Sequence, residues 1–276
     1  MKFRAFIIFF NVFLFFFLAL VSIVPFAALG RELAFSFWKT NWYALPLVLV
    51  ILAAVDIYFA VNGRIFFLLE KEDWPALVQV LEEKVFHRGR YTPRLVKLLA
   101  NTYLVLSDAG SVTELEKKLL INKNALIGDS ALIFGAARIL NKDHLGAAEF
   151  FSSRLPGGEN YKTGARSEWI RWYLGFSLLL SRDFPGAADT FTVLAREGRD
   201  GILTGLAAYF LDDNLARFLP RRSAELRETA AEGKERVRQT LKRRIDWNRE
   251  IKRLETEVYA AVLSSYIGKA GDFVYG

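Results

Sequence analysis

The sequence lacks cysteine altogether, and its 276 residues include two histidines and one methionine. Without thiols, disulfides and thiolate metal sites are excluded, whereas the compartment stays open because cytoplasmic and exported domains can both lack cysteine. His87 and His144 do not have the spacing of metal ligands, so we expect no histidine-based metal site. Glycine motifs typical of nucleotide-binding loops and hydrolase nucleophile elbows are also missing. We therefore predict no cofactor, no catalytic site and no enzyme; catalysis by aspartate and serine alone is the remaining enzymatic alternative.

Phenylalanine is in excess near the start of the chain: half of the 24 Phe residues lie within the first 61 positions. Two apolar runs, Ala5–Leu29 and Tyr43–Val61, follow one another there. The only interruptions are Asn11, Ser22 and Asp56. About 20 apolar helical residues span a bilayer, whereas the apolar core of a signal peptide has only about 7–15. Residues 1–61 therefore predict a hairpin of two retained transmembrane helices, with the aromatic connector Gly30–Trp42 along one membrane face.

Lysine and arginine flank both apolar runs. Two cations precede the first run, Lys2 and Arg4, and two lie in the connector, Arg31 and Lys39. Those that follow the second run are Arg64, Lys71, Lys84, Arg88 and Arg90. The positive-inside tendency favours the ends over the connector. We predict an integral protein of a bacterial-type inner membrane with both termini cytoplasmic; the alternative puts the part after the second run on the periplasmic side.

Asn11 and Asp56 fall at similar depth in such an antiparallel hairpin. We predict that the Asn11 amide donates a hydrogen bond to the Asp56 carboxylate and holds the two helices in register, a contact worth roughly 0.6–2 kcal/mol. The alternatives are that Asp56 reaches the membrane surface or meets Arg64. Intramembrane carboxylates often mark ion pathways, but one aspartate on two helices is too little for a transporter.

Two later segments repeat at an offset of 40 residues: 135–151 and 175–191 share seven identical residues. The same skeleton is fainter upstream, and the aspartates expected in its turns are Asp73, Asp108, Asp143 and Asp183. Each aspartate is expected to end an inter-helix turn and to cap the next helix. The residues expected to let neighbouring helices approach and to fill the space between hairpins are Gly135, Gly175, Phe151 and Phe191. A degenerate fifth unit is expected around Asp213.

These units resemble the tetratricopeptide family, which repeats about 34 residues as a helix–turn–helix. The matching positions are Leu174, Gly175, Asp183, Phe184, Ala187 and Phe191, with Gly135, Ala147 and Phe151 in the preceding unit. The match is good over 125–198 and weak over 62–121. The 40-residue spacing departs from the family, and 155–162 is the lengthened connector. The resemblance implies an α-solenoid over 62–220, whose first helix slot, 62–71, continues directly from the second membrane run.

The C-terminal segment, 221–276, has an amphipathic pattern that predicts one long helix from about Arg222 to Tyr266. Between Lys234 and Arg253 there are nine Lys and Arg residues against three acidic ones. We favour a solvated face on a helix whose apolar stripe closes the repeat array or pairs with a partner. Contact with anionic lipid is an alternative, and nucleic-acid binding is disfavoured because no recognised motif is present.

The predicted fold class is all-α: two transmembrane helices, a tetratricopeptide-like α-solenoid and a long C-terminal helix. The predicted function is a membrane-anchored scaffold whose repeat surface recruits or assembles protein partners. The resemblance implies that the first helices of the units line the binding face, with Arg94, Lys97, Asn101, Asp129, Trp169 and Trp172 as candidates. The two tryptophans equally fit an inter-repeat core. The alternative functions are a permanent subunit of a large envelope assembly, of the secretion or flagellar-motor collar type, and an accessory of an enzyme or transporter.

Overall fold

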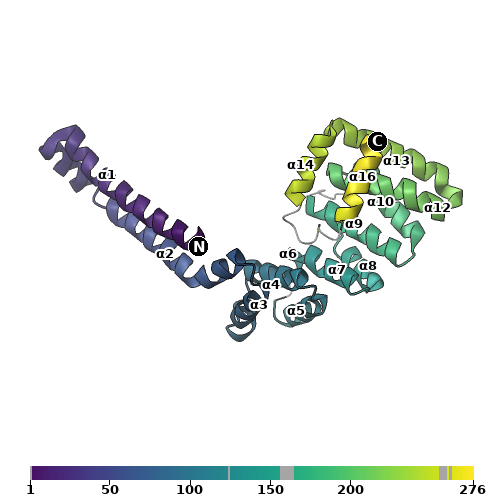
Figure 1. The fold of residues 1–276 in the computed structure, drawn as a ribbon, viewed down its shortest axis with the longest axis horizontal. Coiled ribbons are helices and arrows are strands. Elements are labelled where there is room, and N and C mark those ends of the chain that lie inside the picture. The colour runs from purple at the N-terminus through teal and green to yellow at the C-terminus, as the bar shows by residue number, and fades with distance from the viewer. Residues whose placement is uncertain (1, 124, 156–164, 255–259, 261–262) are drawn as a thin grey trace. The chain divides into compact units, whose positions relative to one another are not determined.

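The computed structural model describes residues 2–123, 125–155, 165–254, 260 and 263–276 (Figure 1). All regular secondary structure in these ranges is helical, which confirms the predicted all-α class. The chain forms two compact units, Met1–Leu81 and Glu82–Gly276. Each unit is described separately below.

The first unit begins with an antiparallel hairpin of α1 (Lys2–Thr40) and α2 (Ala44–Glu70), followed by α3 (Trp74–Glu82). Both long helices contain a stretch long and apolar enough to cross a membrane, Ile8–Ala28 and Pro46–Glu70. The large side chains of these stretches point outward, because the two helices bury little surface against each other.

The predicted connector is mostly helical. Helix α1 continues through it to Thr40, with one break at Gly30, where φ is 76° and ψ is 170°. Only glycine adopts that backbone region readily, so Gly30 ends the first apolar stretch while the chain resumes as a helix directly afterwards.

Helix α2 is continuous to Glu70, which confirms that residues 62–70 extend directly from the second apolar run. The first compact unit runs to Leu81, so it contains the extension of α2 past residue 61 and most of α3.

The second unit consists of paired helices from Glu82 to the C-terminus (Figure 1). After a π-helical turn, η1 (Glu83–His87), the first helices are α4 (Pro93–Val105), α5 (Ala109–Asn122), α6 (Ala125–Asp129), α7 (Ala131–Leu140) and α8 (His144–Ser152). They are followed by α9 (Ala165–Leu180), α10 (Phe184–Glu197), α11 (Gly201–Phe210), the π-helical turn η2 (Leu211–Leu215) and α12 (Ala216–Phe218). The last elements are the 3-10 turn η3 (Pro220–Arg222), α13 (Ser223–Thr240), α14 (Arg244–Leu254) and α16 (Ser264–Tyr275). Except for Leu155, the predicted connector 155–162 lies outside the described residues.

Four turns between helices share one backbone geometry. Each contains a residue with φ between 55° and 66°; these residues are Glu72, Ser107, Lys142 and Arg182. The next residue is an aspartate whose backbone N–H donates to the carbonyl five residues back at 2.8–3.0 Å. Its side chain accepts from the backbone N–H three residues on at 3.0–3.2 Å. The first bond closes one helix and the second opens the next. The caps predicted at Asp73, Asp108, Asp143 and Asp183 are confirmed.

Two phenylalanine rings each rest on a glycine of their own hairpin. A Cβ added to Gly135 would lie 2.0 Å from the Cζ of Phe151, and one on Gly175 would lie 2.8 Å from the Cε1 of Phe191. On the other side, Phe151 stacks on a tyrosine of α9 with ring centroids 5.4 Å apart, and Phe191 stacks on Phe210 of α11 at 5.6 Å. The rings therefore fill the space between neighbouring hairpins, as predicted, and the glycines make room for the rings.

The prediction of one long C-terminal helix is wrong. The described part of that segment contains α13, α14 and α16, and residues 241–243 break the helix between the first two. There the Arg243 N–H donates to the Asp246 carboxylate at 3.1 Å, which starts a new helix as in a capping box. The described part of the segment also packs on α10 and α11 and lies within the second unit.

Asp213 is also not the turn aspartate of a fifth unit. It lies inside the π-helical turn η2, where its carboxylate accepts from the Tyr209 hydroxyl at 3.1 Å and pairs with Arg217 at 2.9 Å. The turn that leads into α13 lies at Pro220–Arg222 instead, because proline ends the preceding helix.

Candidate functional site

The predicted polar pair lies between α1 and α2. The Asn11 Nδ2 donates to the Asp56 Oδ1 at 3.2 Å, so the structure brings these two side chains together at one level of the hairpin. Ser22 instead donates to the Leu18 carbonyl of its own helix at 2.8 Å. Of the polar residues that interrupt the apolar runs, the two predicted partners join the helices, whereas Ser22 satisfies itself locally.

On α4, three of the predicted partner-binding residues form one stripe. Thr92 caps the helix by accepting from the Leu95 N–H at 3.3 Å, and a proline follows in the first turn. Arg94 and Lys97 are exposed, and Asn101 is half-buried. Because residues three and four apart share a helix face, these side chains lie on one side of α4, opposite its apolar residues.

Asn101 lies at the more buried end of this stripe. Its Oδ1 atom is shielded from solvent and accepts no hydrogen bond from any described residue. A buried acceptor without a donor costs free energy, and because this atom is shielded, a partner reaches it only when the neighbouring side chains move. The stripe thus combines two exposed side chains with one unsatisfied oxygen.

Asp129, at the end of α6, is exposed and forms an ion pair with Arg166 at 3.6 Å, while Arg166 also donates to the Gly128 carbonyl. This contact links α6 to α9. The carboxylate is therefore engaged within the unit, in contrast to the Asn101 oxygen.

Trp169 and Trp172 do not lie on a binding surface. Their side chains are 5% and 0% exposed, and Trp172 lies within 5.1 Å of Phe176 and 5.9 Å of Phe191, measured between ring centroids. Aromatic clusters of this kind are typical of cores. The alternative interpretation, an inter-repeat core, is the correct one for both tryptophans.

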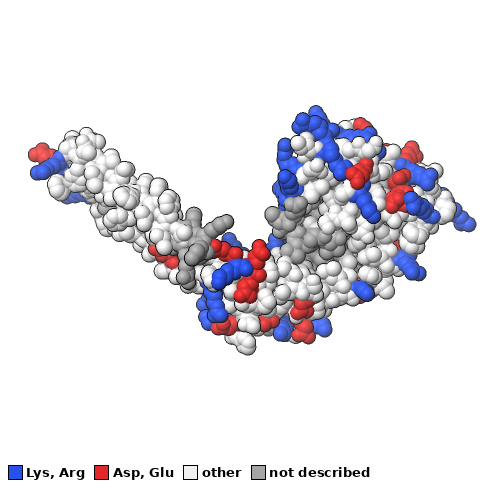
Figure 2. Space-filling model, viewed as in Figure 1, with Lys and Arg blue, Asp and Glu red and all other residues white. Residues whose placement is uncertain are grey.

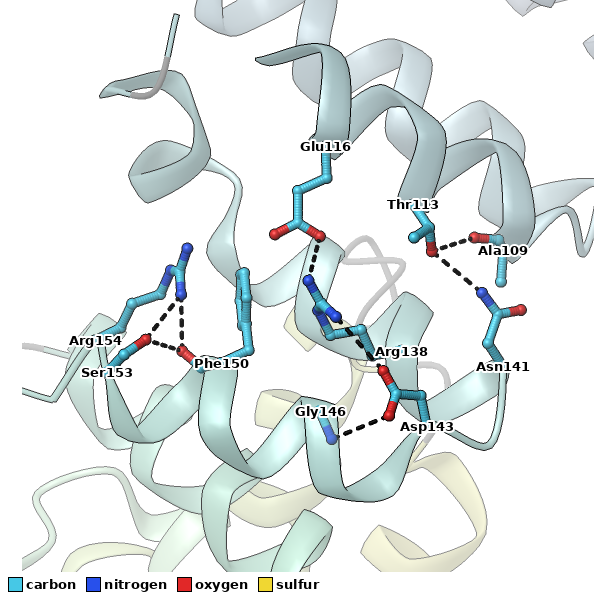
Figure 3. A network of polar contacts seen from close by, with 10 residues as sticks. All are labelled: Ala109, Thr113, Glu116, Arg138, Asn141, Asp143, Gly146, Phe150, Ser153 and Arg154. Atoms are coloured by element: carbon cyan, nitrogen blue, oxygen red, sulfur yellow. Dashed lines mark hydrogen bonds and ion pairs between the residues drawn. The ribbon is translucent and has the colours of Figure 1, made fainter. Parts of the chain in front are cut away.

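A polar network that sequence reasoning missed joins α5 to α7 and α8 (Figure 3). Arg138 pairs with Glu116 at 2.9 Å and with Asp143 at 3.5 Å, and the Glu116 residue is only 3% exposed. The Asn141 amide donates to the Thr113 hydroxyl at 3.2 Å. An ion pair this deeply placed fixes the geometry of its helices, since breaking it leaves a buried charge.

Beside this network, the guanidinium group of Arg154 lies over an aromatic ring. Its guanidinium carbon is 3.4 Å from the centre of the Phe150 ring, and burial lowers the pKa of this guanidinium. The Arg154 Nη1 donates to the Phe150 carbonyl at 2.8 Å (Figure 3). The arginine thus closes the C-terminal end of α8.

A second missed feature is a recess of about 470 Å³ at the start of α11, lined in part by charged side chains. The Glu168 carboxylate accepts from the backbone N–H groups of Arg199 and Asp200 at 2.9–3.1 Å. Asp200 in turn caps α11, and burial raises the pKa of its carboxyl. Both carboxylates accept hydrogen bonds from backbone N–H groups. The role that the structure shows for them is therefore structural.

The exposed face of α14, with the residues before it, forms what we call the basic surface (Figure 2). It comprises Lys242, Arg243, Ile245, Arg249, Lys252 and Arg253, all of them exposed. Figure 2 shows Lys and Arg gathered over this end of the second unit. Of the nine cations predicted between Lys234 and Arg253, three lie on α13, and five belong to this surface on α14 and the residues before it.

The described residues thus define an all-α protein built from helical pairs with equivalent capped turns, together with two helices long enough to cross a membrane. The chain belongs to the family described as "Uncharacterised Treponema protein", whose model matches residues 111–276. The matched region lies entirely within the second unit.

A Treponema pallidum (strain Nichols) protein described as uncharacterized is 29% identical over 185 residues. The aligned region covers 67% of this chain and 58% of the relative, so the chain spans less than two thirds of the relative's length. No solved structure matches the chain.

Proposed function

We propose that the protein is a membrane-anchored scaffold whose tetratricopeptide-like repeats recruit or assemble partner proteins. The observation that carries the proposal is the recurrence of one turn geometry at Asp73, Asp108, Asp143 and Asp183. Equivalent turns produce equivalent helix pairs, and stacked pairs of this kind form extended protein-binding surfaces.

The anchor in this proposal is the α1–α2 hairpin, inserted in a bacterial-type inner membrane with both termini in the cytoplasm. Its two apolar stretches and their outward-facing side chains support insertion. A C-terminal reporter fusion that is active on only one side of the membrane tests the orientation, and activity on the periplasmic side would overturn it.

The binding face in this proposal centres on the α4 stripe of Arg94, Lys97 and Asn101. Two exposed side chains and one buried, unsatisfied oxygen lie on the same helix face. We expect the partner to offer acidic side chains to these two exposed cations.

The test compares two double variants of the full chain, recovered from native membranes after cross-linking. Arg94→Ala with Lys97→Ala is expected to reduce the recovered partner at least about five-fold, because truncation of a hot spot costs more than about 1 kcal/mol. Lys117→Ala with Lys123→Ala removes the same charge from exposed positions on α5 and at its C-cap and is the matched control.

Helicity by circular dichroism should be the same for both variants. Equal partner recovery from them would contradict the assignment of the α4 stripe.

A permanent subunit of a large envelope assembly is the second candidate. It is favoured by large apolar side chains exposed in the second unit, among which Ile121 is 85%, Leu145 69% and Phe218 54% exposed. Exposed apolar groups of this size often mark interfaces. A complex that stays intact through high salt and gel filtration would support this candidate, whereas rapid partner exchange would support recruitment.

A further inference from the structure

The buried side of α14 is held in place by one tryptophan. Trp247 is 0% exposed. A Cβ added to Gly205 of α11 would lie 2.7 Å from the indole ring, and one on Gly271 of α16 would lie 2.6 Å from its Nε1. Two helices, α11 and α16, therefore each place a glycine against this indole ring. Close packing of that kind fixes the orientation of α14.

Because Trp247 points inward, the opposite face of α14 points outward. Ile245, Asn248, Arg249 and Lys252 are spaced three and four residues apart and are all exposed, as expected for one helix face. Ile245 is 57% exposed. The basic surface thus contains one apolar side chain surrounded by cations.

The carboxylates nearby do not neutralise this surface. Asp246 lies 3.5 Å from Arg243 and 3.7 Å from Arg249, and Glu250 lies 3.7 Å from Arg253. The three arginine side chains remain 72–82% exposed, and ion pairs between groups this exposed are weak. Among the described residues 242–254, the five cations of this surface stand beside two carboxylates, Asp246 and Glu250, which leaves an excess of three positive charges there.

We propose that the basic surface docks on the anionic headgroups of a lipid bilayer. Lys and Arg side chains near an anionic surface each strengthen attachment, and an apolar side chain among them enters the boundary between headgroups and acyl chains. A nucleic acid would use the cations but has no comparable site for Ile245.

The tether within the same chain adds to this argument. When the two apolar helices are inserted, the second unit is confined near the membrane, and a tethered surface binds at a high effective concentration. The attachment therefore needs only modest intrinsic affinity.

Because the sequence contains no cysteine, a single introduced cysteine can be labelled selectively. The full chain with Asn248→Cys is labelled with an environment-sensitive fluorophore and placed in nanodiscs of phosphatidylcholine, alone or with phosphatidylglycerol. Both leaflets of a nanodisc are accessible, so the orientation of the anchor does not affect the result. Anionic nanodiscs should shift the emission to shorter wavelength and protect the label from acrylamide, and high salt should reverse both effects.

A triple variant tests the cations. Each cation near an anionic surface multiplies the docking equilibrium roughly five-fold, so Arg249→Gln, Lys252→Gln and Arg253→Gln together should reduce it roughly a hundred-fold. The matched control removes three exposed cations elsewhere, by Lys117→Gln, Lys123→Gln and Arg227→Gln, and should dock as the native chain does. A label at Glu114→Cys, exposed on α5, should not respond to anionic lipid.

Three results would overturn the proposal. The first is equal acrylamide access to the Asn248→Cys label in neutral and anionic nanodiscs. The second is equal loss of docking in the two triple variants, because that would indicate general charge attraction. The third is a response of the label to a DNA or RNA duplex without a response to anionic lipid.

Discussion

The α1–α2 hairpin and the second unit use phenylalanine in opposite ways. In the hairpin, Phe9 and Phe15 are each 71% exposed, whereas Phe151 and Phe191 in the second unit are 0% exposed. Burial of apolar area stabilises a unit in water. The second unit therefore supplies its own apolar surroundings, whereas the hairpin requires them from outside, as the bilayer in our proposal provides.

The polar contacts that join helices also differ between the two regions. The hairpin joins its helices by the Asn11–Asp56 hydrogen bond. The second unit instead repeats its capped turns and adds the buried pair of Glu116 and Arg138. The Asn11–Asp56 contact joins two helices once, whereas the capped turns of the second unit recur along the chain.

The largest expected effect comes from the same substitution made in both regions. Phe191→Ala should lower the free energy of unfolding of the second unit by about 3–5 kcal/mol, because it leaves a cavity beside Gly175 and Phe210. Phe16→Ala changes a residue that is 67% exposed, and it should alter this free energy by less than about 0.5 kcal/mol. Urea titration of the full chain in detergent, followed by near-ultraviolet circular dichroism, measures both. Similar losses in the two variants would remove the contrast between inward and outward phenylalanine.

Glycine substitutions sharpen the comparison within the second unit. Gly135→Ala should destabilise it by about 1–3 kcal/mol, because the added Cβ overlaps the Phe151 ring. Gly175→Ala should cost less, since its Cβ would lie 2.8 Å from the nearest ring atom instead of 2.0 Å. The control is Gly128→Ala on α6, where nothing lies within 4 Å and alanine should stabilise the helix by about 0.5–1 kcal/mol. A Gly135→Ala variant as stable as this control would show that the ring moves aside without cost.

Local signals explain what could be predicted from the sequence. The turn aspartates act on backbone N–H groups three residues away, so short-range chemistry places Asp143 and Asp183 correctly. The apolar runs and the Asn11–Asp56 pair follow from length and from the antiparallel geometry of a hairpin. These features depend on few distant residues.

The features that were missed depend on distant residues. The amphipathic pattern continues past Leu241, yet the helix breaks there and Trp247 enters a seat formed by Gly205 and Gly271. The sequence around each glycine does not indicate that a tryptophan packs against it. For the same reason the pattern could not decide whether Trp172 lies in a groove or a core, because neighbouring helices decide it.

The hairpin contact itself gives the next prediction. Asn11→Leu leaves the Asp56 carboxylate without its amide donor and should weaken the association of α1 and α2 by roughly 0.6–2 kcal/mol. Spin labels on cysteines introduced at the exposed positions Phe9 and Ile57 report the helix separation in nanodiscs, and the distance distribution should broaden. Ser22→Ala is the control, because Ser22 bonds within its own helix. An unchanged distribution in Asn11→Leu would mean that lipid and apolar packing alone hold the hairpin.

The smallest expected effect is a pH dependence confined to the second unit. Burial, with the nearby Glu168 and Glu250 carboxylates, raises the pKa of Asp200 above its ordinary value, although two backbone N–H groups act against the rise. Between the ordinary pKa and the raised pKa, the folded protein holds a proton that the unfolded chain has lost. The stability contributed by this group is therefore complete below about pH 4 and is lost as the pH rises through the raised pKa.

Asp200→Asn keeps an oxygen that can accept from the Ile202 and Leu203 N–H groups, and it abolishes the titration. The difference in unfolding free energy, native minus variant, should therefore fall as the pH rises above about 4 and then become constant. Urea titrations of both proteins across this range measure the difference, in which the titration of unchanged carboxylates cancels. If the native and Asp200→Asn curves run parallel, Asp200 is solvated in the folded state, and the recess at the start of α11 is open to water.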